Sequence, residues 1–262
     1  MKYIDCHSHW SDPRLFERPE WREWLQSAIA QQIDFFLLGG QEPLEWKNQV
    51  ILKNQYPENF GLCFGLHPYF VSQHSFEECE SALDELAQRL PQAMALGEAG
   101  LDFRPHIMKD SAAQQIEMFE NQIEIAKAFA KPMVLHLVQA HEKALQVFNL
   151  WDPPDRGGFV HAFTGSYETA RSYIDRGFLI SVGGAVTYDK NKKLHDCVKK
   201  IPLEALLLES DAPDQPPLAW SAEVNHSQAI LNVARAIAQI RELSPIDILE
   251  ISASNFKRLF RC

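Results

Sequence analysis

The chain has 262 residues, of which 46% are hydrophobic and 23% charged, and its formal net charge is −10. This composition is that of an ordinary globular protein, and the length suits one large α/β domain or two small ones that fold without disulfide bonds. The acidic balance excludes an extended basic groove for nucleic acid, so a polynucleotide would have to be bound locally, at an end or over a few nucleotides.

Apolar runs of strand length recur along the chain, and an amphipathic stretch follows each of them. One such stretch, Ser111–Ala130, carries Ile116, Phe119 and Ile123 on one face and therefore predicts a helix. The last stretch, from about Asn225 to Phe260, predicts two closing helices. The apolar runs are Tyr3–Cys6, Ile33–Leu38, Gly61–Gly65, Ala93–Gly97, Met133–His136, Gly158–His161, Phe178–Val182 and Ala205–Leu208. Eight such units predict a single α/β domain over residues 1–262, a (β/α)8 TIM-type barrel with C-terminal helices; an open, doubly wound sheet is the alternative.

Polar residues follow these runs, at the end of a barrel where catalytic groups usually lie. In the first strand Asp5, His7 and His9 share one face at a period of two, and Cys6 points away as a small core residue. Later strands end in Glu98, His136, His161 and Asp211. One histidine at a strand end is more often a hydrogen-bonded core residue than a ligand. Four histidines and two carboxylates at one end would each cost several kcal/mol without partners, and metal coordination satisfies them together.

The residue types indicate two divalent ions of the Mg, Mn or Zn kind. Imidazole suits zinc and similar metals, carboxylates suit these and harder ions, and six ligands exceed the three or four of one catalytic zinc. Two ions roughly 3.5–4 Å apart, sharing a carboxylate and a water, would use all six ligands. Glu98 is the natural bridge in strand order. Such a site keeps about one net positive charge, which favours an anionic phosphodiester without excluding esters or amides.

The chain resembles the TatD family of metal-dependent deoxyribonucleases, within the amidohydrolase-type barrels, over essentially its whole length. The motifs that carry the resemblance are DCHSH at 5–9, GLHP at 65–68, GEAGLD at 97–102, KPMVLH at 131–136, HAFTGS at 161–166, VGGAVTY at 182–188, ESDAP at 209–213 and NFKRLF at 255–260. The resemblance implies divalent-metal-dependent hydrolysis of DNA, often from a 3′ end.

The resemblance also implies a role for each site residue. The first ion would be held by His7, His9 and Asp211, the second by His136 and His161, and Glu98 would bridge them. Asp211 would orient or deprotonate the attacking water, and His67 would contact the scissile phosphate or the leaving oxygen. Glu209, on the same strand face as Asp211, would support the ligands from behind.

The substrate side departs from the family pattern. Leu137 and Val138 stand where the family commonly carries an arginine after the fifth-strand histidine, and the segment 220–226 also lacks one. Arg104 is expected to replace one such contact. The other expected substrate contacts are Asp102, Tyr69 and Phe103, and aromatic rings at Trp10, Tyr69, Phe70 and Phe103 could stack on bases for about 1–3 kcal/mol each. The remaining histidines, at 74, 106, 141, 195 and 226, are expected on the surface or on helices.

Three functions remain open at this point. The leading one is a two-metal deoxyribonuclease or phosphodiesterase acting on DNA ends or short single strands. The second is an ester or amide hydrolase, such as an aminoacyl-tRNA deacylase, and the third is a non-catalytic, metal-bearing interaction subunit. No obligate protein partner is implied. Five cysteines without a CxxC pair, a first strand that begins at Lys2, and the lack of an apolar run of roughly 18 residues predict a cytoplasmic protein without a membrane span.

Overall fold

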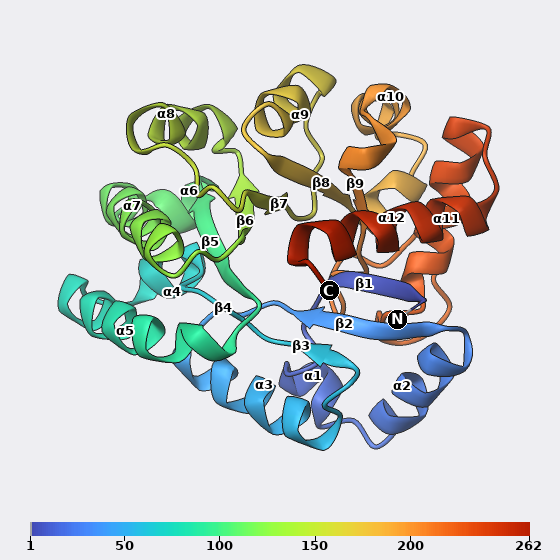
Figure 1. Cartoon of the computed structure of the whole chain (residues 1–262), viewed down its shortest axis with the longest axis horizontal. Coiled ribbons are helices and arrows are strands. Elements are labelled where there is room, and N and C mark those ends of the chain that lie inside the picture. The colour runs from blue at the N-terminus through green and yellow to red at the C-terminus, as the bar shows by residue number, and fades with distance from the viewer. Residues whose placement is uncertain (1) are drawn as a thin grey trace.

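Nine strands, all paired in parallel, form the inner layer of the structure, a computed structural model that describes residues 2–262 (Figure 1). The strands are β1 (Tyr3–Ser8), β2 (Ile33–Leu38), β3 (Phe60–Gly61), β4 (Cys63–Phe64), β5 (Ala95–Asp102), β6 (Met133–Val138), β7 (Gly158–Val160), β8 (Phe178–Val182) and β9 (Leu206–Leu208). Leu62 interrupts the third predicted strand, so that β3 pairs with β2 and β4 pairs with β5.

The last strand returns to the first. Just beyond β9, the Asp211 backbone N–H donates to the His7 carbonyl (3.1 Å), and the His9 N–H donates to the Ala212 carbonyl (2.7 Å). Because β3 and β4 together occupy one position, the strands form an eight-position parallel barrel. The predicted TIM-type barrel is therefore confirmed.

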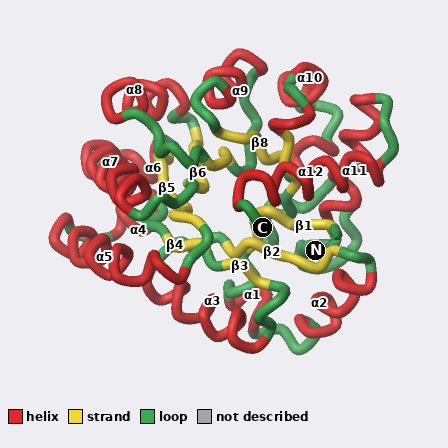
Figure 2. The backbone as a smooth tube through the Cα atoms, in the orientation of Figure 1, coloured by secondary structure: helices red, strands yellow, loops and turns green. Residues whose placement is uncertain are grey.

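The helices form the outer layer (Figure 2). They are α1 (Pro13–Phe16), α2 (Trp21–Ala30), α3 (Pro43–Gln55), α4 (Pro68–Gln73), α5 (Phe76–Arg89), α6 (Pro105–Met108), α7 (Ala112–Ala128), α8 (His141–Trp151), α9 (Tyr167–Ile174), α10 (Lys192–Lys200), α11 (Ala229–Arg241) and α12 (Pro245–Phe260), with short 3-10 turns η1 (Leu90–Gln92), η2 (Gly184–Thr187) and η3 (Leu203–Ala205). The two predicted closing helices are α11 and α12. Pro245 in the first turn and a capping box between Ser244 and Asp247 fix where α12 begins.

The apolar core has two parts. The larger lies between the strands and the surrounding helices. The smaller fills the barrel, because strands from all around it contribute side chains such as Ile4, Phe35, Val134 and Phe159, and Phe256 of α12 joins them. Figure 1 shows α12 crossing one end of the barrel. Because Phe256 packs against Phe35, near the start of β2, α12 covers the amino ends of the strands and leaves the carboxyl ends open.

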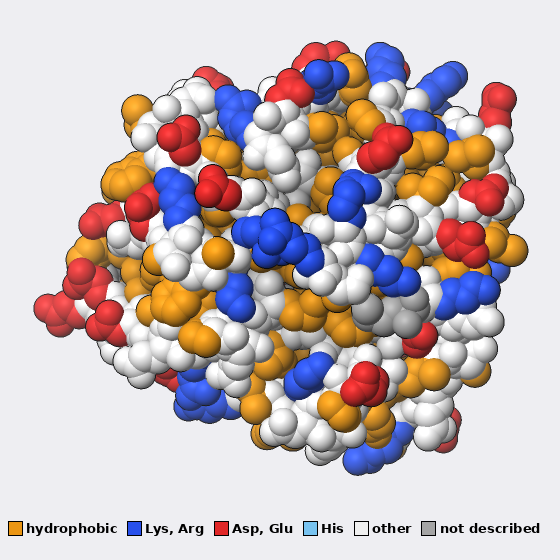
Figure 3. Space-filling view, viewed as in Figure 1, with side chains coloured by type: hydrophobic (Ala, Val, Ile, Leu, Met, Phe, Trp, Pro, Cys, Tyr) orange, Lys and Arg blue, Asp and Glu red, His pale blue; other side chains and the backbone are white. Residues whose placement is uncertain are grey.

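The face that carries α12 mixes apolar and charged side chains, with several Lys and Arg side chains near its middle (Figure 3). Within residues 2–262, no helix combines the length and the apolar character that crossing a membrane requires.

Candidate metal centre

The six predicted ligands come together at the carboxyl ends of the barrel strands. Five of them are buried, with side chains from four strand positions: His7, His9, Glu98, His161 and Asp211. His136, within β6, is half-buried. Two of the three groups of His and acidic side chains that could hold an ion contain only these residues, and the third adds His67.

The two carboxylate oxygens of Glu98 face different pairs of imidazoles. Oε1 lies 3.6 Å from His7 Nε2 and 3.4 Å from His9 Nε2. Oε2 lies 3.0 Å from His161 Nε2 and 3.5 Å from His136 Nδ1. Glu98 therefore stands between two sets of nitrogen ligands.

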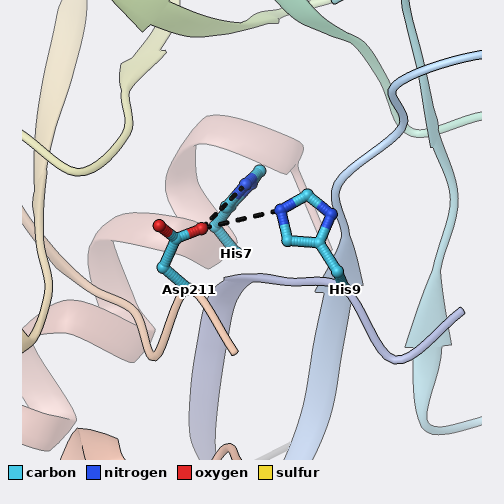
Figure 4. Close-up of side chains that lie close together, drawn as sticks. All are labelled: His7, His9 and Asp211. Carbon is cyan, nitrogen blue, oxygen red and sulfur yellow. Dashed lines mark ion pairs between the residues drawn. The ribbon is translucent and has the colours of Figure 1, made fainter. Parts of the chain in front are cut away.

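Asp211 completes the first set. Its Oδ1 lies 3.6 Å from both His7 Nε2 and His9 Nε2, and all three side chains point toward one another (Figure 4). The other oxygen, Oδ2, accepts a hydrogen bond from Gln215 Nε2 (2.5 Å), which fixes the carboxylate plane.

The distances and the unpaired atoms fit divalent ions. Ligand atoms about 2.0–2.2 Å from one tetrahedral ion lie roughly 3.3–3.6 Å apart, close to the separations around each Glu98 oxygen. Several buried polar atoms have no hydrogen-bond partner, namely both ring nitrogens of His7, Nδ1 of His9, Nδ1 of His161 and Oε1 of Glu98. Buried polar atoms are rarely left unpaired because their desolvation is costly. Cations between these groups would satisfy Glu98 Oε1 and His7 Nε2.

The charges within the cluster are strongly coupled. Burial opposes ionisation of Glu98, but His7, His161 and His9 outweigh it and hold the pKa of its carboxyl well below the usual value. Burial also disfavours the charged form of His136, but Asp102 and Glu98 raise its pKa to about 9. For His7, burial and the neighbouring His161 lower the pKa to about 4. At pH 7 Glu98 is thus ionised and His7 neutral, the states in which they can bind a cation, whereas His136 would release a proton when an ion binds.

Each of three imidazoles has a further carboxylate behind it. His136 Nε2 lies 3.4 Å from Asp102 Oδ2, and His161 Nδ1 lies 3.9 Å from Glu209 Oε1. His9 Nδ1 lies 3.6 Å from Glu45 Oε1. The contact between Asp102 and His136 is a hydrogen bond and orients that ring, whereas the other two contacts are longer and electrostatic.

Sequence reasoning missed Glu45. It lies in the first turn of α3, where it accepts hydrogen bonds from Ser11 Oγ (2.9 Å) and the Gln41 N–H (2.8 Å). Its only signal in the sequence is an acidic residue shortly after the second strand, and such residues are common at helix starts.

The structure corrects the expected role of Asp102. The side chain is fully buried and does not line the cavity. Its carboxylate accepts from Arg104 Nε (3.0 and 2.9 Å) and faces His136. Burial opposes its ionisation, but His136 and Arg104 outweigh burial and lower the pKa of Asp102. Asp102 therefore orients a candidate ligand, and the Arg104 side chain, which does line the cavity, is tied to it.

His67 lies at the edge of the cluster with a defined tautomer. Its Nδ1 accepts a hydrogen bond from the Tyr69 backbone N–H (2.9 Å). The proton of the neutral ring is therefore on Nε2, which lies 3.9 Å from Glu98 Oε2. Burial and the adjacent His136 hold the pKa of His67 well below its usual value, so the ring offers one N–H donor to the cavity.

A cavity of about 1010 Å³ opens above the cluster. Its wall includes Tyr69, which is 45% exposed, together with Leu137 and Val138. The other proposed stacking rings lie elsewhere. Trp10 is fully buried and donates from Nε1 to Ser227 Oγ (2.9 Å), so it cannot stack on a base, and Phe103 packs against the core.

One of the remaining histidines differs from expectation. His226 is buried outside any helix and stacks on Trp24, with ring centroids 5.5 Å apart. His141 begins α8, as expected for a helix residue, and its half-buried ring also lines the cavity beside the candidate centre.

Two glycines make room for the cluster. A Cβ on Gly39 would lie 2.6 Å from Cε1 of both His7 and His9. At Gly100 the backbone has φ of +147°, and a Cβ would lie 2.1 Å from the His136 carbonyl oxygen. Only glycine allows both the conformation and the close approach of β5 to β6 there.

The comparisons with known proteins agree with this geometry. The family model for TatD-related DNases matches residues 4–261. The metal-dependent hydrolase YabD of Bacillus subtilis is 36% identical over 98% of this chain and 98% of its own. A protein of Erwinia billingiae named 3′-5′ ssDNA/RNA exonuclease TatD is 32% identical over 90% of this chain and 91% of its own.

Among solved structures, that of YjjV, a TatD homologue from Escherichia coli, matches with a TM-score of 0.85 and 28% identity, covering 100% of this chain and 98% of that one. The family match extends over nearly the whole chain, including every residue of the buried cluster. The chain therefore belongs to the family of TatD-related DNases and is a metal-dependent hydrolase.

Proposed function

We propose that this hydrolase cleaves phosphodiester bonds of DNA, at an end or in a short single strand, with two divalent ions bound on either side of Glu98. The observation that carries the proposal is the division of the Glu98 oxygens. One faces His7 and His9, and the other faces His136 and His161. Glu98 and these four imidazoles would hold the two ions, which would supply Lewis-acid chemistry at the cavity.

When bound, the two ions would activate a water molecule and polarise the phosphoryl oxygens. Asp211 is the proposed base: Gln215 holds its Oδ2, so Oδ1 faces the space in front of His7 and His9 and can orient the water and accept its proton. His67 would donate from Nε2 to the phosphate or to the leaving oxygen. Glu209, whose Oε1 lies 3.9 Å from His161 Nδ1, would favour a proton on that nitrogen and so leave Nε2 free to bind an ion.

Two further observations support a nucleic acid substrate bound locally. The Erwinia billingiae relative is named an exonuclease for ssDNA and RNA. Hydrolysis of a phosphodiester bond in a single strand is the corresponding reaction for this cavity. The net charge of −10 disfavours a long bound duplex, whereas a strand end needs contacts with few phosphates.

The test is cleavage of end-labelled single-stranded DNA with Mg²⁺, Mn²⁺ or Zn²⁺. We expect shortened products with at least one metal, no products after treatment with a chelator, and no activity in Asp211→Asn. Asp189→Asn, which changes an exposed carboxylate outside the cavity, is the matched control and should retain activity. Cleavage by Asp211→Asn at the wild-type rate would contradict the mechanism.

An ester or amide hydrolase is the second candidate, because Leu137 and Val138 give the cavity an apolar stretch where a phosphate contact was expected. D-aminoacyl-tRNA and a panel of model esters should be assayed beside the DNA. Turnover of these compounds, with no nuclease activity under any metal, would favour this candidate over the first.

A further inference from the structure

Three Lys and Arg side chains line the cavity above the candidate metal centre: Arg14, Arg104 and Lys193. At about 1010 Å³ the cavity reaches the upper end of the roughly 300–1,000 Å³ usual for ligand sites. It therefore has room for more than the group that is cleaved. An anionic polymer in this space needs a cation beyond the metal centre.

The two arginines are already paired with carboxylates. Arg14 contacts Asp12 at 2.7 Å and Asp214 at 2.8 Å, and it links the loops that follow β1 and β9. Arg104 Nη2 lies 2.5 Å from Asp102, which is fully buried. Pairing cancels most of the field that either guanidinium could offer to a ligand.

Lys193 differs from both. It is exposed in the first turn of α10, and no carboxylate within residues 2–262 forms an ion pair with it. His141 lines the same cavity, and burial together with Lys193 lowers the pKa of His141 to about 4. The imidazole is therefore neutral at pH 7, and Lys193 supplies the unbalanced charge of this wall.

The position of Lys193 in the strand order shows which candidate ligands it lies near. His141, the exposed Thr164 and Lys193 follow β6, β7 and β8 respectively, and all three line the cavity. His136 and His161 come from β6 and the end of β7. Strand order therefore places Lys193, which follows β8, next to the strand that carries His161, and its charge acts on His141.

We propose that Lys193 binds the phosphate next to the scissile one, so that the substrate is an oligonucleotide with at least two phosphates. The proposal rests on the proposed phosphodiesterase function and adds a second anion subsite to it. Lys193 would donate a charge-assisted hydrogen bond to a non-bridging phosphate oxygen, with the Thr164 hydroxyl as a neighbouring donor.

The experiment compares the thymidine trinucleotide TpTpT, which has two phosphates, with TpT, which has one. The measured quantity is the ratio of kcat/KM for TpTpT to that for TpT. Lys193→Ala should lower this ratio about tenfold, the effect of one charge-assisted hydrogen bond, and Lys193→Glu should lower it further. Lys192→Ala and Lys192→Glu change the neighbouring exposed lysine, which does not line the cavity, and should keep the wild-type ratio.

The salt dependence gives an independent readout. Each phosphate contact of a single strand contributes about 0.7 to the slope of log K against log salt, so Lys193→Ala should reduce the TpTpT slope by about that amount. A ratio and slope unchanged in Lys193→Ala would overturn the proposal. An equal loss for both substrates would also overturn it, since Lys193 would then act on the scissile group or on folding.

Failure of the proposed function would be distinguishable. If the wild-type protein cleaves no phosphodiester with any metal, binding of fluorescently labelled TpTpT and TpT to the metal-loaded protein replaces the kinetic ratio. A preference for TpTpT that depends on Lys193 would retain the subsite and reject the phosphodiesterase. The subsite would be rejected if neither oligonucleotide binds, or if Lys193→Ala binds TpTpT and TpT with the same preference as the wild type.

Discussion

Glu98 joins the two halves of the candidate centre through separate oxygens. In Glu98→Gln an amide nitrogen replaces one of these oxygens, and an amide nitrogen is not a metal ligand. We expect the metal content after gel filtration to fall from two ions per chain to one or none, and turnover to fall at least about 100-fold.

Elemental analysis measures the metal content of the variant directly. Glu80→Gln, an exposed change on α5, should keep both ions. Two ions retained in Glu98→Gln would show that this carboxylate does not bridge.

Asp102 acts on the candidate centre through His136. Asp102→Asn keeps the shape of the side chain but removes the charge that holds the ring, so metal affinity should fall about 10–100-fold. Competition with a chromogenic chelator measures this affinity. Arg104→Ala leaves the carboxylate in place and should have a smaller effect. An equal loss of metal affinity in both variants would mean that the affinity depends on Arg104 and not on the contact between Asp102 and His136.

His226 links stability to pH. Burial lowers its pKa from 6.5 to about 4, so the folded state resists protonation while the unfolded chain binds a proton below pH 6.5. Its contribution to stability is complete above pH 6.5 and is lost as the pH falls toward 4; by pH 5 the loss should reach about 2 kcal/mol.

The measurement is urea unfolding of the chelator-treated protein between pH 7.5 and 5, for the wild type and His226→Gln. The difference in unfolding free energy between them should shrink by about 2 kcal/mol as the pH falls, since the variant lacks the titrating group. A difference that stays constant with pH would rule out this role.

At the scale of elements, the approach of β5 to β6 depends on Gly100. Gly100→Ala places a Cβ 2.1 Å from the His136 carbonyl oxygen at a backbone with positive φ, so it should cost about 3 kcal/mol or more and displace His136. At Gly177, φ is +85° but the nearest atom to a Cβ is 3.9 Å away. Gly177→Ala should therefore cost only about 1 kcal/mol. If both variants lose the same unfolding free energy in chemical denaturation, the contact with β6 does not contribute to the cost at Gly100.

The strands also show which structural features could be predicted from the sequence and which could not. The apolar runs predicted all eight barrel positions, because buried parallel strands are apolar throughout. Strict alternation put Asp5, His7 and His9 on one face. In the structure Cys6 packs inside the barrel, whereas the Asp5 carboxylate accepts from the Ser210 N–H at 2.8 Å. The register shifts between Asp5 and Ser8, and again between Leu96 and Ala99. Both irregularities contain a candidate ligand, His7 or Glu98, and a period of two cannot predict a local shift.

The supporting contacts were harder to predict than the ligands. His, Glu and Asp at strand ends form a pattern that the chain order reveals. Glu45 and the buried Asp102–Arg104 pair depend on where side chains point after a loop, and Trp10 looked exposed because it follows a strand end, although its ring lies in the core. Such orientations follow from tertiary packing and leave no periodic signal.

For the whole molecule, bound ions should contribute to stability. Ions that bind only the folded state at 100 times their dissociation constant add about 2.7 kcal/mol, which corresponds to roughly 5–10 °C in Tm for a chain of this size. Treatment with a chelator should lower the Tm of the wild type by this amount, and the shift should be much smaller in Glu98→Gln. An unchanged Tm after verified metal removal would contradict the fit of the cluster to ions.

The candidate metal ligands and the other cavity residues lie on different parts of the fold, and this separation affects how such enzymes can diverge in function. The candidate ligands sit at strand ends in the packed barrel, whereas Tyr69, Thr164 and Lys193 belong to loops and helix starts at its rim. Substitutions at the rim can change which substrate enters without rebuilding the centre, since loops tolerate change that a packed core does not. A lineage built this way can inherit one reaction chemistry while its members acquire different substrates.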